Sequence, residues 1–220
     1  MTQSQPEGSL ALPPSGKGSP VLVLHAWWGM NDTLKAFCTR LAKSGFVAFA
    51  PDLYHGRVAD TITGAEALAN ALDARAPQAR TEIAAASMFL TERAGQTGHG
   101  FAVIGFSLGA YYALDLAATH PEHIRSVILF YGTGGGDFSN SRAAYLGHFA
   151  EKDEYEPRSN VDALEEALRR AGRPVKFHRY SGTGHWFFEP DRLQAYNQAA
   201  ARLAWERTLA FLKRSSARIS

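Results

Sequence analysis

The chain has 220 residues, which is enough for one ordinary domain but too few for two large ones. Hydrophobic residues make up 45% and charged residues 20%, so the chain can bury a sizeable core and is not disordered as a whole. With 23 basic and 21 acidic residues the formal net charge is +2, which argues against a dedicated nucleic-acid-binding protein. We expect a single domain over residues 1–220, with 1–7 as a flexible terminus.

The amino-terminal residues carry no targeting signal that we recognise. They lack the basic start and the apolar stretch of a signal peptide, and the apolar run 21–30 is too short to span a bilayer. Cys38 is the only cysteine, which excludes an internal disulfide and a cysteine-based zinc site. These features predict a soluble, cytoplasmic protein with no membrane partner.

Apolar runs and helix-spaced apolar residues alternate along the chain. The expected elements, in chain order, are an edge strand at 9–12, a strand at 21–24, a helix from Asn31 to Gly45, a strand at 46–50, a helix from Thr63 to before Pro77, a helix at 80–93, a strand at 101–104, a helix ending near Thr119, strands at 126–131 and 145–149, a helix from Asn160 to Gly172, a strand at 175–180 and a helix at 191–213. Asn31, Thr63 and Asn160 are the expected helix caps.

Strands that alternate with helices predict an α/β fold, with a mainly parallel, twisted sheet covered by helices on both faces. Sheets of this kind place their sites at the carboxyl ends of the strands. The residues that follow each predicted strand are therefore the first candidates for function.

The pattern Gly105-x-Ser107-x-Gly109 follows one predicted strand and opens a helix. Glycines two residues before and after a serine are typical of a nucleophile elbow, where a strand turns so sharply into a helix that side chains would collide. We interpret Ser107 as a nucleophile rather than an idle serine in a glycine-rich turn.

A serine nucleophile needs a base, and the order of residues in this fold puts a histidine late in the chain. His185 fits, since it follows the last strand in a loop with two glycines, whereas the other seven histidines lie earlier, within strands or past helix ends. The acid that orients the histidine should lie between the two. Asp153 fits best, although Glu151, Glu154 and Asp137 compete with it on sequence grounds.

An oxyanion needs two donors. The backbone N–H of Leu108 is one candidate, and that of Trp27, in the loop after the strand at 21–24, is the other. Aromatic residues near these strand ends could line an apolar substrate pocket, and the candidates are Trp28, Phe106, Trp186 and Tyr54.

Metal chemistry is the weaker interpretation of the remaining polar residues. His25, Asp52 and His55 have a suggestive spacing, but scattered histidines and aspartates are common at strand ends, so we expect no metal. Cys38 lies on the apolar face of the first expected helix and is better explained as a small core residue than as a nucleophile.

Five stretches together resemble the dienelactone hydrolase family of α/β-hydrolases: HAWWGMND (25–32), APDLYHGR (50–57), GFSLGA (105–110), HFAEKDEYEP (148–157) and GTGHWFFEP (182–190). The resemblance implies a compact α/β-hydrolase fold without a large cap domain. It also implies Ser107, Asp153 and His185 as the catalytic triad. We also expect no cofactor.

The sequence departs from that family at two positions. The family's name-giving enzymes carry a cysteine nucleophile where this chain has Ser107, and a glutamate that helps to activate the thiol where it has Ala26. A serine activated by His185 has no need of that glutamate, so the two changes favour a serine esterase. Arg57 and Arg142 are candidates for binding a substrate carboxylate, but a solvated surface position explains both better.

The sequence thus predicts a hydrolase that cleaves ester or lactone bonds of a small molecule through an acyl-enzyme on Ser107. Dienelactone hydrolase activity proper, or a thioesterase, amidase or acyl transferase on the same triad, is the alternative. A non-catalytic binding protein is a third hypothesis. Either a monomer or a homodimer is compatible with the sequence.

Overall fold

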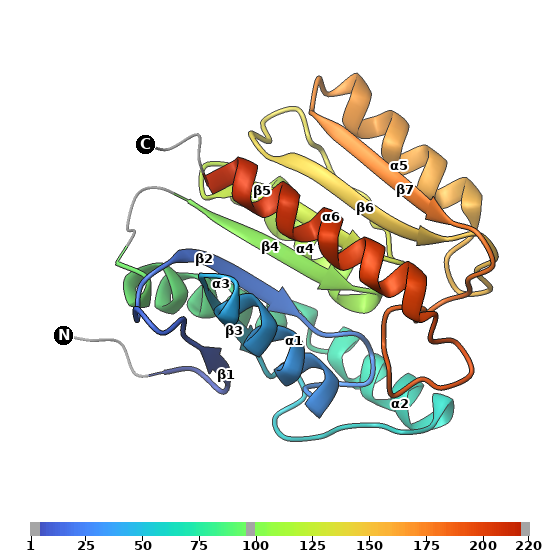
Figure 1. Cartoon of the computed structure of the whole chain (residues 1–220), viewed down its shortest axis with the longest axis horizontal. Coiled ribbons are helices and arrows are strands. Elements are labelled where there is room, and N and C mark those ends of the chain that lie inside the picture. Colours follow the sequence, from blue (N-terminus) through green and yellow to red (C-terminus); the bar gives the residue numbers. More distant parts are fainter. Residues whose placement is uncertain (1–4, 96–99, 217–220) are drawn as a thin grey trace.

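A seven-stranded sheet forms the centre of the molecule in the computed structural model, which describes residues 5–95 and 100–216 (Figure 1). Its strands lie in the order β1-β3-β2-β4-β5-β6-β7. Their bounds are β1 Gly8–Ala11, β2 Ser19–Leu24, β3 Phe46–Pro51, β4 Phe101–Phe106, β5 Ile124–Phe130, β6 Ala144–Ala150 and β7 Val175–Tyr180.

All neighbouring strands are parallel except β1, which pairs antiparallel with β3. The predicted mainly parallel sheet is therefore confirmed, and β1 is the edge strand expected near residues 9–12. Parallel strands need crossover connections, and the helices supply them. As a result, the carboxyl ends of β2, β4, β6 and β7 meet at one edge of the sheet.

Helices cover both faces of the sheet. Their bounds are α1 Asp32–Lys43, α2 Ile62–Asp73, α3 Ala76–Arg93, α4 Leu108–Thr119, α5 Arg158–Arg170 and α6 Gln198–Ser216. The buried faces of α1 and α6 pack into one core layer, and those of α3, α4 and α5 pack into the other. Figure 1 shows α1 and α6 together in front of the sheet.

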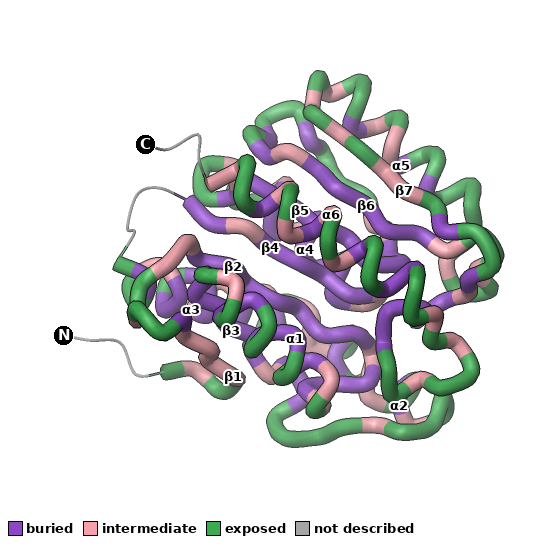
Figure 2. Tube along the Cα trace, in the orientation of Figure 1, coloured by how far each residue is buried: buried purple, intermediate pink, exposed green. Residues whose placement is uncertain are grey.

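The central strands are buried on both sides, which explains their uninterrupted apolar sequences (Figure 2). Residues 21–24 are fully buried, and so is nearly the whole of β3. Cys38 is a free, buried cysteine of α1, and burial raises the pKa of its thiol to about 12. This confirms that Cys38 is a core residue.

Four expected helix starts were wrong, those of α2, α3, α5 and α6. The cap of α2 is Thr61, whose hydroxyl accepts from the N–H of Gly64, rather than Thr63. Pro77 lies in the first turn of α3, where its missing N–H costs nothing, so α3 begins at Ala76 and not near residue 80. Asn160 is inside α5, which begins at Arg158 after Pro157.

The last helix is also shorter than expected. Residues 190–197 form turns, and α6 begins at Gln198 because the side chain of Asn197 accepts from the N–H of Ala200.

At the other end of the chain, Glu7 departs from the flexible terminus that we predicted. Its carbonyl accepts from the N–H of Asp52, and its carboxylate lies 2.6 Å from His55 Nδ1. Of the other residues in that prediction, 5 and 6 form no helix or strand, and 1–4 lie outside the described residues.

None of the helices in the described part of the chain combines the length and the apolar character needed to cross a membrane.

Candidate active site

Ser107 lies in the sharp turn between β4 and α4. Its φ is 48° and its ψ is −112°, a backbone conformation that non-glycine residues rarely adopt. The two flanking glycines make this turn possible, because a Cβ at Gly105 would collide with the carbonyl of Gly109, and a Cβ at Gly109 with that of Leu24. Strained backbone of this kind costs on the order of 1–3 kcal/mol and is concentrated at functional sites.

Ser107, His185 and Asp153 are joined by hydrogen bonds. Ser107 Oγ lies 2.9 Å from His185 Nε2, and His185 Nδ1 lies 2.8 Å from each carboxylate oxygen of Asp153. The side chains of His185 and Asp153 are only 5% and 6% exposed. The three residues come from turns after β4, β6 and β7, so the parallel sheet brings together positions that are far apart in the sequence.

Asp153 is itself held in place by the backbone. Its Oδ1 accepts from the N–H groups of Tyr155 (3.0 Å) and Glu156 (2.9 Å), so the turn after β6 fixes the carboxylate toward His185. This leaves His185 Nδ1 to donate to Asp153 and Nε2 free to accept the proton of Ser107.

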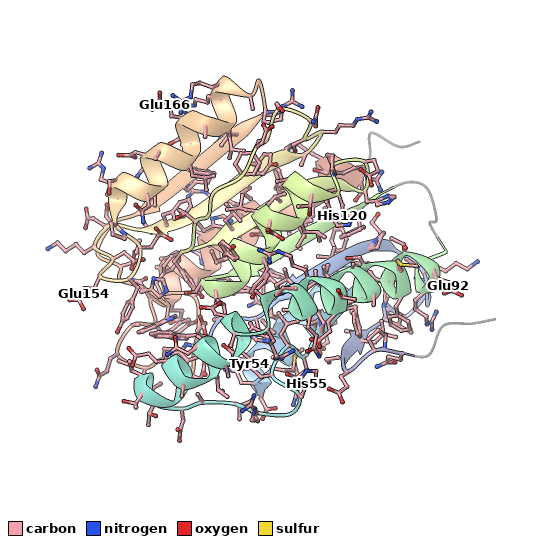
Figure 3. All side chains as sticks on the ribbon, turned by 180° about the vertical axis from the view of Figure 1, so that it is seen from behind. Tyr54, His55, Glu92, His120, Glu154 and Glu166 are labelled. Carbon is pink, nitrogen blue, oxygen red and sulfur yellow. The ribbon has the colours of Figure 1, made fainter. Side chains whose placement is uncertain are left out.

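The competing acids have other partners or point elsewhere. Glu151 accepts from the N–H of Gly182, and Asp137 accepts from that of Ser139, which holds the pKa of Asp137 below its usual value. Glu154 points outward from the surface in Figure 3. Of the four acids considered from the sequence, Asp153 is the one hydrogen-bonded to His185.

Aromatic rings enclose His185. Tyr131, Tyr155 and Trp186 have ring centroids 5.0, 5.2 and 4.9 Å from that of His185. Trp27 stacks on Trp186 at 5.8 Å and meets the edge of Tyr155 at 5.4 Å. The enclosure reduces the access of water to the imidazole, which strengthens the hydrogen bonds around it.

Two cavities lie near these residues. The first, which we call the His185 groove, has a volume of about 1080 Å³ and is lined by His185, Asp153, Tyr155, Trp186 and Trp28 among others. The second, the α1–α6 cavity, has a volume of about 570 Å³, and its lining includes Trp28, Phe106 and Ala26.

The four aromatic residues that we expected in a substrate pocket lie in different places. Trp186 lines the His185 groove, Phe106 lines the α1–α6 cavity, and Trp28 lines both. Tyr54 is only 1% exposed, packs 4.7 Å from the ring of His25, and lines neither of these cavities. Burial raises the pKa of its hydroxyl above the usual value. Its placement in the core is a correction to the pocket role that we expected.

The two expected oxyanion donors lie at the carboxyl ends of neighbouring strands, Trp27 after β2 and Leu108 after β4 and Ser107. Leu108 is the first residue of α4, where the N–H has no partner within the helix. Trp27 is in the turn after β2, next to β4 in the sheet. The ring of Trp27 contacts those of Tyr155 and Trp186, and both of these rings contact His185.

The sequence pattern that suggested zinc has structural explanations. His25 is buried, its Nδ1 lies 2.7 Å from the carbonyl of Ala26, and burial lowers its pKa. Asp52 accepts from the N–H groups of Tyr54 and Gly56, while His55 pairs with Glu7. No group of three or more His, Cys, Asp or Glu within the described residues is arranged to hold a metal ion.

The two arginines considered for a substrate carboxylate lie outside the groove. Arg142 is exposed at the amino end of β6, the opposite edge of the sheet from Asp153. Arg57 is exposed, and its Nε donates to the carbonyl of Tyr54.

A buried Tyr131–Glu189 pair behind His185 was missed from the sequence. Tyr131 follows β5 with a φ of 37°, and its hydroxyl donates to Glu189 Oε1 at 2.7 Å. Glu189 is 5% exposed and lies four residues after His185. The one available signal was an acid in the otherwise apolar stretch Trp186-Phe187-Phe188, which suggests that it is buried. The segment that follows His185 is thus tied to the core through Glu189.

Replacing Glu189 by glutamine should change how stability depends on pH. Burial raises the pKa of Glu189 from 4.5 to about 8, so the folded protein keeps a proton that the unfolded chain loses above pH 4.5. The free energy of unfolding of the wild type should therefore fall between pH 4.5 and 8, by on the order of 3–5 kcal/mol in total. Glutamine cannot ionise and still accepts from Tyr131, so the variant should lack this loss.

Urea unfolding of both proteins at pH 5 and pH 8 measures the effect. We expect the variant to be more stable than the wild type at pH 8 by several kcal/mol, and by much less at pH 5. Glu166→Gln is the matched control, because this carboxylate is exposed on α5 (Figure 3). An equal stability difference at both pH values would mean that Glu189 is ionised throughout.

Comparisons with known proteins agree with this architecture. The model of the "Dienelactone hydrolase family" matches residues 7–216. "Protein usf" of Aquifex pyrophilus is 32% identical over 94% of this chain and 92% of its own. The "Putative carboxymethylenebutenolidase" of Aquifex aeolicus is 32% identical over 91% of this chain and 90% of its own.

A solved structure, the "Putative Dienelactone Hydrolase" of Klebsiella pneumoniae, is 25% identical to this chain. It superposes with a TM-score of 0.80 over 94% of this chain and 92% of its own. These findings confirm the predicted α/β-hydrolase fold without a large cap domain and the resemblance found in the sequence. They also make the chain an enzyme of the class that hydrolyses esters and lactones.

Proposed function

Because the chain belongs to the dienelactone hydrolase family, we propose that it hydrolyses ester or lactone bonds of a small substrate through an acyl-enzyme on Ser107. The observation that carries the proposal is the hydrogen-bonded chain from Ser107 Oγ through His185 to Asp153. A serine at its ordinary pKa is a weak nucleophile, and this chain provides both the base and the group that orients it.

In the first half of the reaction, Ser107 Oγ attacks the carbonyl carbon while His185 Nε2 takes the hydroxyl proton. The charge that develops on the carbonyl oxygen is stabilised by the N–H groups of Leu108 and Trp27. His185 then gives its proton to the leaving alcohol, and the acyl group stays on Ser107. Asp153 holds the imidazole in the required tautomer and stabilises its protonated form.

In the second half, His185 takes a proton from water, and the resulting hydroxide attacks the acyl carbon. Collapse of the second tetrahedral intermediate breaks the bond to Ser107 Oγ, which recovers its proton from His185. The products are a carboxylic acid and the free enzyme. Every step uses side chains and backbone groups of this chain, so the mechanism needs no cofactor.

The His185 groove is the substrate site in this proposal, because two of the three triad residues, His185 and Asp153, line it. Trp28 and Trp186 line it with apolar surface, which suits an ester with an apolar portion. Dienelactone hydrolase activity proper is the second candidate, favoured by the name of the relative from Aquifex aeolicus. Turnover of a dienelactone beside an aryl ester separates the two candidates, and a matched thioester tests for thioesterase activity.

Pre-steady-state release of p-nitrophenol from p-nitrophenyl acetate tests the acyl-enzyme. We expect a burst of about one equivalent from the wild type, because acylation precedes a slower hydrolysis, and no burst from Ser107→Ala. Ser139→Ala, which changes an exposed loop serine, should keep the burst. Equal slow release from the wild type and Ser107→Ala would refute Ser107 as the nucleophile and favour a binding role.

A further inference from the structure

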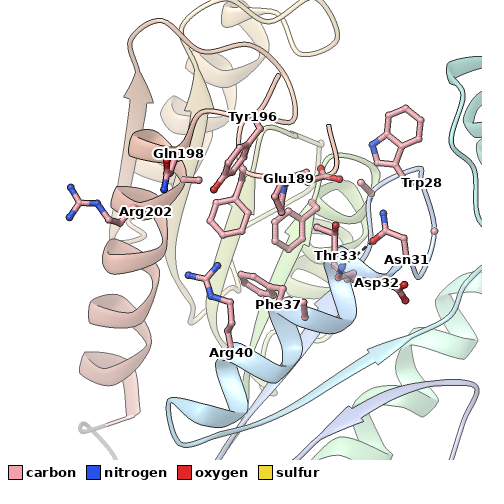
Figure 4. Close-up of a pocket in the computed structure, with 18 residues that line it drawn as sticks. Trp28, Asn31, Asp32, Thr33, Phe37, Arg40, Glu189, Tyr196, Gln198 and Arg202 are labelled. Carbon is pink, nitrogen blue, oxygen red and sulfur yellow. Dashed lines mark hydrogen bonds between the residues drawn. The ribbon is translucent and has the colours of Figure 1, made fainter. Parts of the chain in front are cut away.

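The α1–α6 cavity is separate from the His185 groove. It lies between α1 and the start of α6, and its wall is built from the aromatic rings of Trp28, Phe37, Phe106 and Phe188 (Figure 4). His185 and Asp153 line the groove and not this cavity, and the two spaces share Trp28 and Tyr196. A volume of about 570 Å³ is in the range that holds a small organic ligand.

A positive charge stands at the outer part of this apolar cavity. Arg40 extends from α1 toward the space between the helices in Figure 4, with its guanidinium 4.1 Å from the ring of Trp205. Within the described residues, no carboxylate pairs with Arg40. Arg202 of α6 also lines the cavity, but it points outward and lies 3.6 Å from Glu206. Arg40 is therefore the cation available to a ligand.

The acidic side chains of the lining do not offset that charge. The side chain of Asp32 is 99% exposed and pairs with Lys35. Asp32 also precedes Arg40 by eight residues, which places the two about 12 Å apart along the helix axis. Glu189 lies at the inner end and accepts from Tyr131, and its burial favours the neutral acid around pH 7. A ligand in the cavity would thus meet aromatic walls along its length and a guanidinium at one end.

We propose that the α1–α6 cavity is a second binding site, which takes a small monocarboxylate with an aromatic or alkyl body. The body packs against Phe37, Phe106 and Phe188, and the carboxylate accepts hydrogen bonds from Arg40. Guanidinium is the side-chain group best matched to a carboxylate, and bonds between two charged groups are stronger than those between neutral ones. Because Trp28 is shared, an occupied cavity also contacts a wall of the His185 groove.

The four tryptophans allow the site of binding to be located. Trp28 lines the cavity and Trp205 contacts the guanidinium of Arg40, which also lines it. Trp186 contacts the ring of His185, and Trp27 stacks on Trp186. We would titrate ¹⁵N-labelled protein with 4-phenylbutanoate, after assigning the four indole N–H signals with single Trp→Phe variants. The expected result is that the signals of Trp28 and Trp205 move and that those of Trp27 and Trp186 stay.

Matched ligands and variants test the role of the charge. Arg40→Gln, and exchange of the acid for 4-phenylbutan-1-ol, should each weaken binding about tenfold or more. Arg170→Gln, which changes an exposed arginine of α5, should leave the affinity unchanged. Ser107→Ala should also bind normally, so the result does not depend on the proposed hydrolysis.

Four outcomes would overturn the proposal. Two concern binding itself: binding that moves the Trp27 and Trp186 signals but not that of Trp205, or no binding at millimolar ligand. The other two concern the charge: equal affinity for the acid and the alcohol, or unchanged affinity in Arg40→Gln. Circular dichroism of Arg40→Gln separates loss of the site from loss of the fold.

Discussion

Replacing His185 by alanine should lower kcat for an aryl ester by about 10⁴–10⁶-fold, while the fold persists. His185 Nε2 lies 2.9 Å from Ser107 Oγ, and without the imidazole only water, a much weaker base, is left to take the hydroxyl proton. The imidazole is used four times in each turnover, to remove and return a proton in both halves of the reaction. No other histidine is hydrogen-bonded to Ser107 in the described part of the chain.

Steady-state hydrolysis of p-nitrophenyl acetate measures the loss, with thermal unfolding as the check on folding. His120→Ala is the control, because this histidine is exposed at the end of α4 (Figure 3). The control should keep the kcat of the wild type. A His185→Ala variant within tenfold of the wild type would mean that another group acts as the base.

Asp153→Asn should lower kcat by about 10⁴-fold with little change in KM. The asparagine Oδ1 can still accept from the N–H groups of Tyr155 and Glu156, so the turn after β6 keeps its shape. Its Nδ2 group then faces His185 Nδ1 and donates to it. The imidazole is thereby locked in the tautomer that carries its proton on Nε2, and it can no longer accept the proton of Ser107.

Comparison with Glu154→Gln isolates this effect, since Glu154 is a neighbouring acid that points away from the protein surface. The loss in Asp153→Asn should appear in kcat, because the substrate still meets the same groove. An Asp153→Asn variant within about threefold of the wild type would rule out this acid and return Glu151 and Asp137 to consideration.

The three residues of the proposed triad differ in how far the local sequence predicts them. The elbow at Ser107 was predictable, because two glycines and a serine between a buried strand and a helix leave few other conformations. His185 was predictable from its place after the last strand. For the acid, the residues favoured Asp153 but left Glu151, Glu154 and Asp137 open, and the family resemblance pointed to Asp153. Glu151, Asp153 and Glu154 share one turn, so the direction of each side chain distinguishes them.

The errors in helix boundaries have a related cause. Thr61 and Thr63 have the same chemistry two residues apart, and the choice between them depends on which one has an extended backbone. Residues 190–197 have a sequence compatible with a helix, yet they form turns where Arg192 lies over the ring of Trp28 at 4.1 Å. Weak intrinsic propensities give way to tertiary contacts in such places.

The amino-acid sequence by itself determined the order of strands and helices, the mainly parallel sheet, the elbow and the family. Each of these depends on residues close together in the chain or on motifs in a set order. Only the tertiary structure decided the contact distance between Asp153 and His185, that Tyr131 and Glu189 pair behind it, that Tyr54 is core, and that α1 and α6 enclose a cavity. These features join residues from separate crossovers of the sheet, and no local spacing encodes the distance between them.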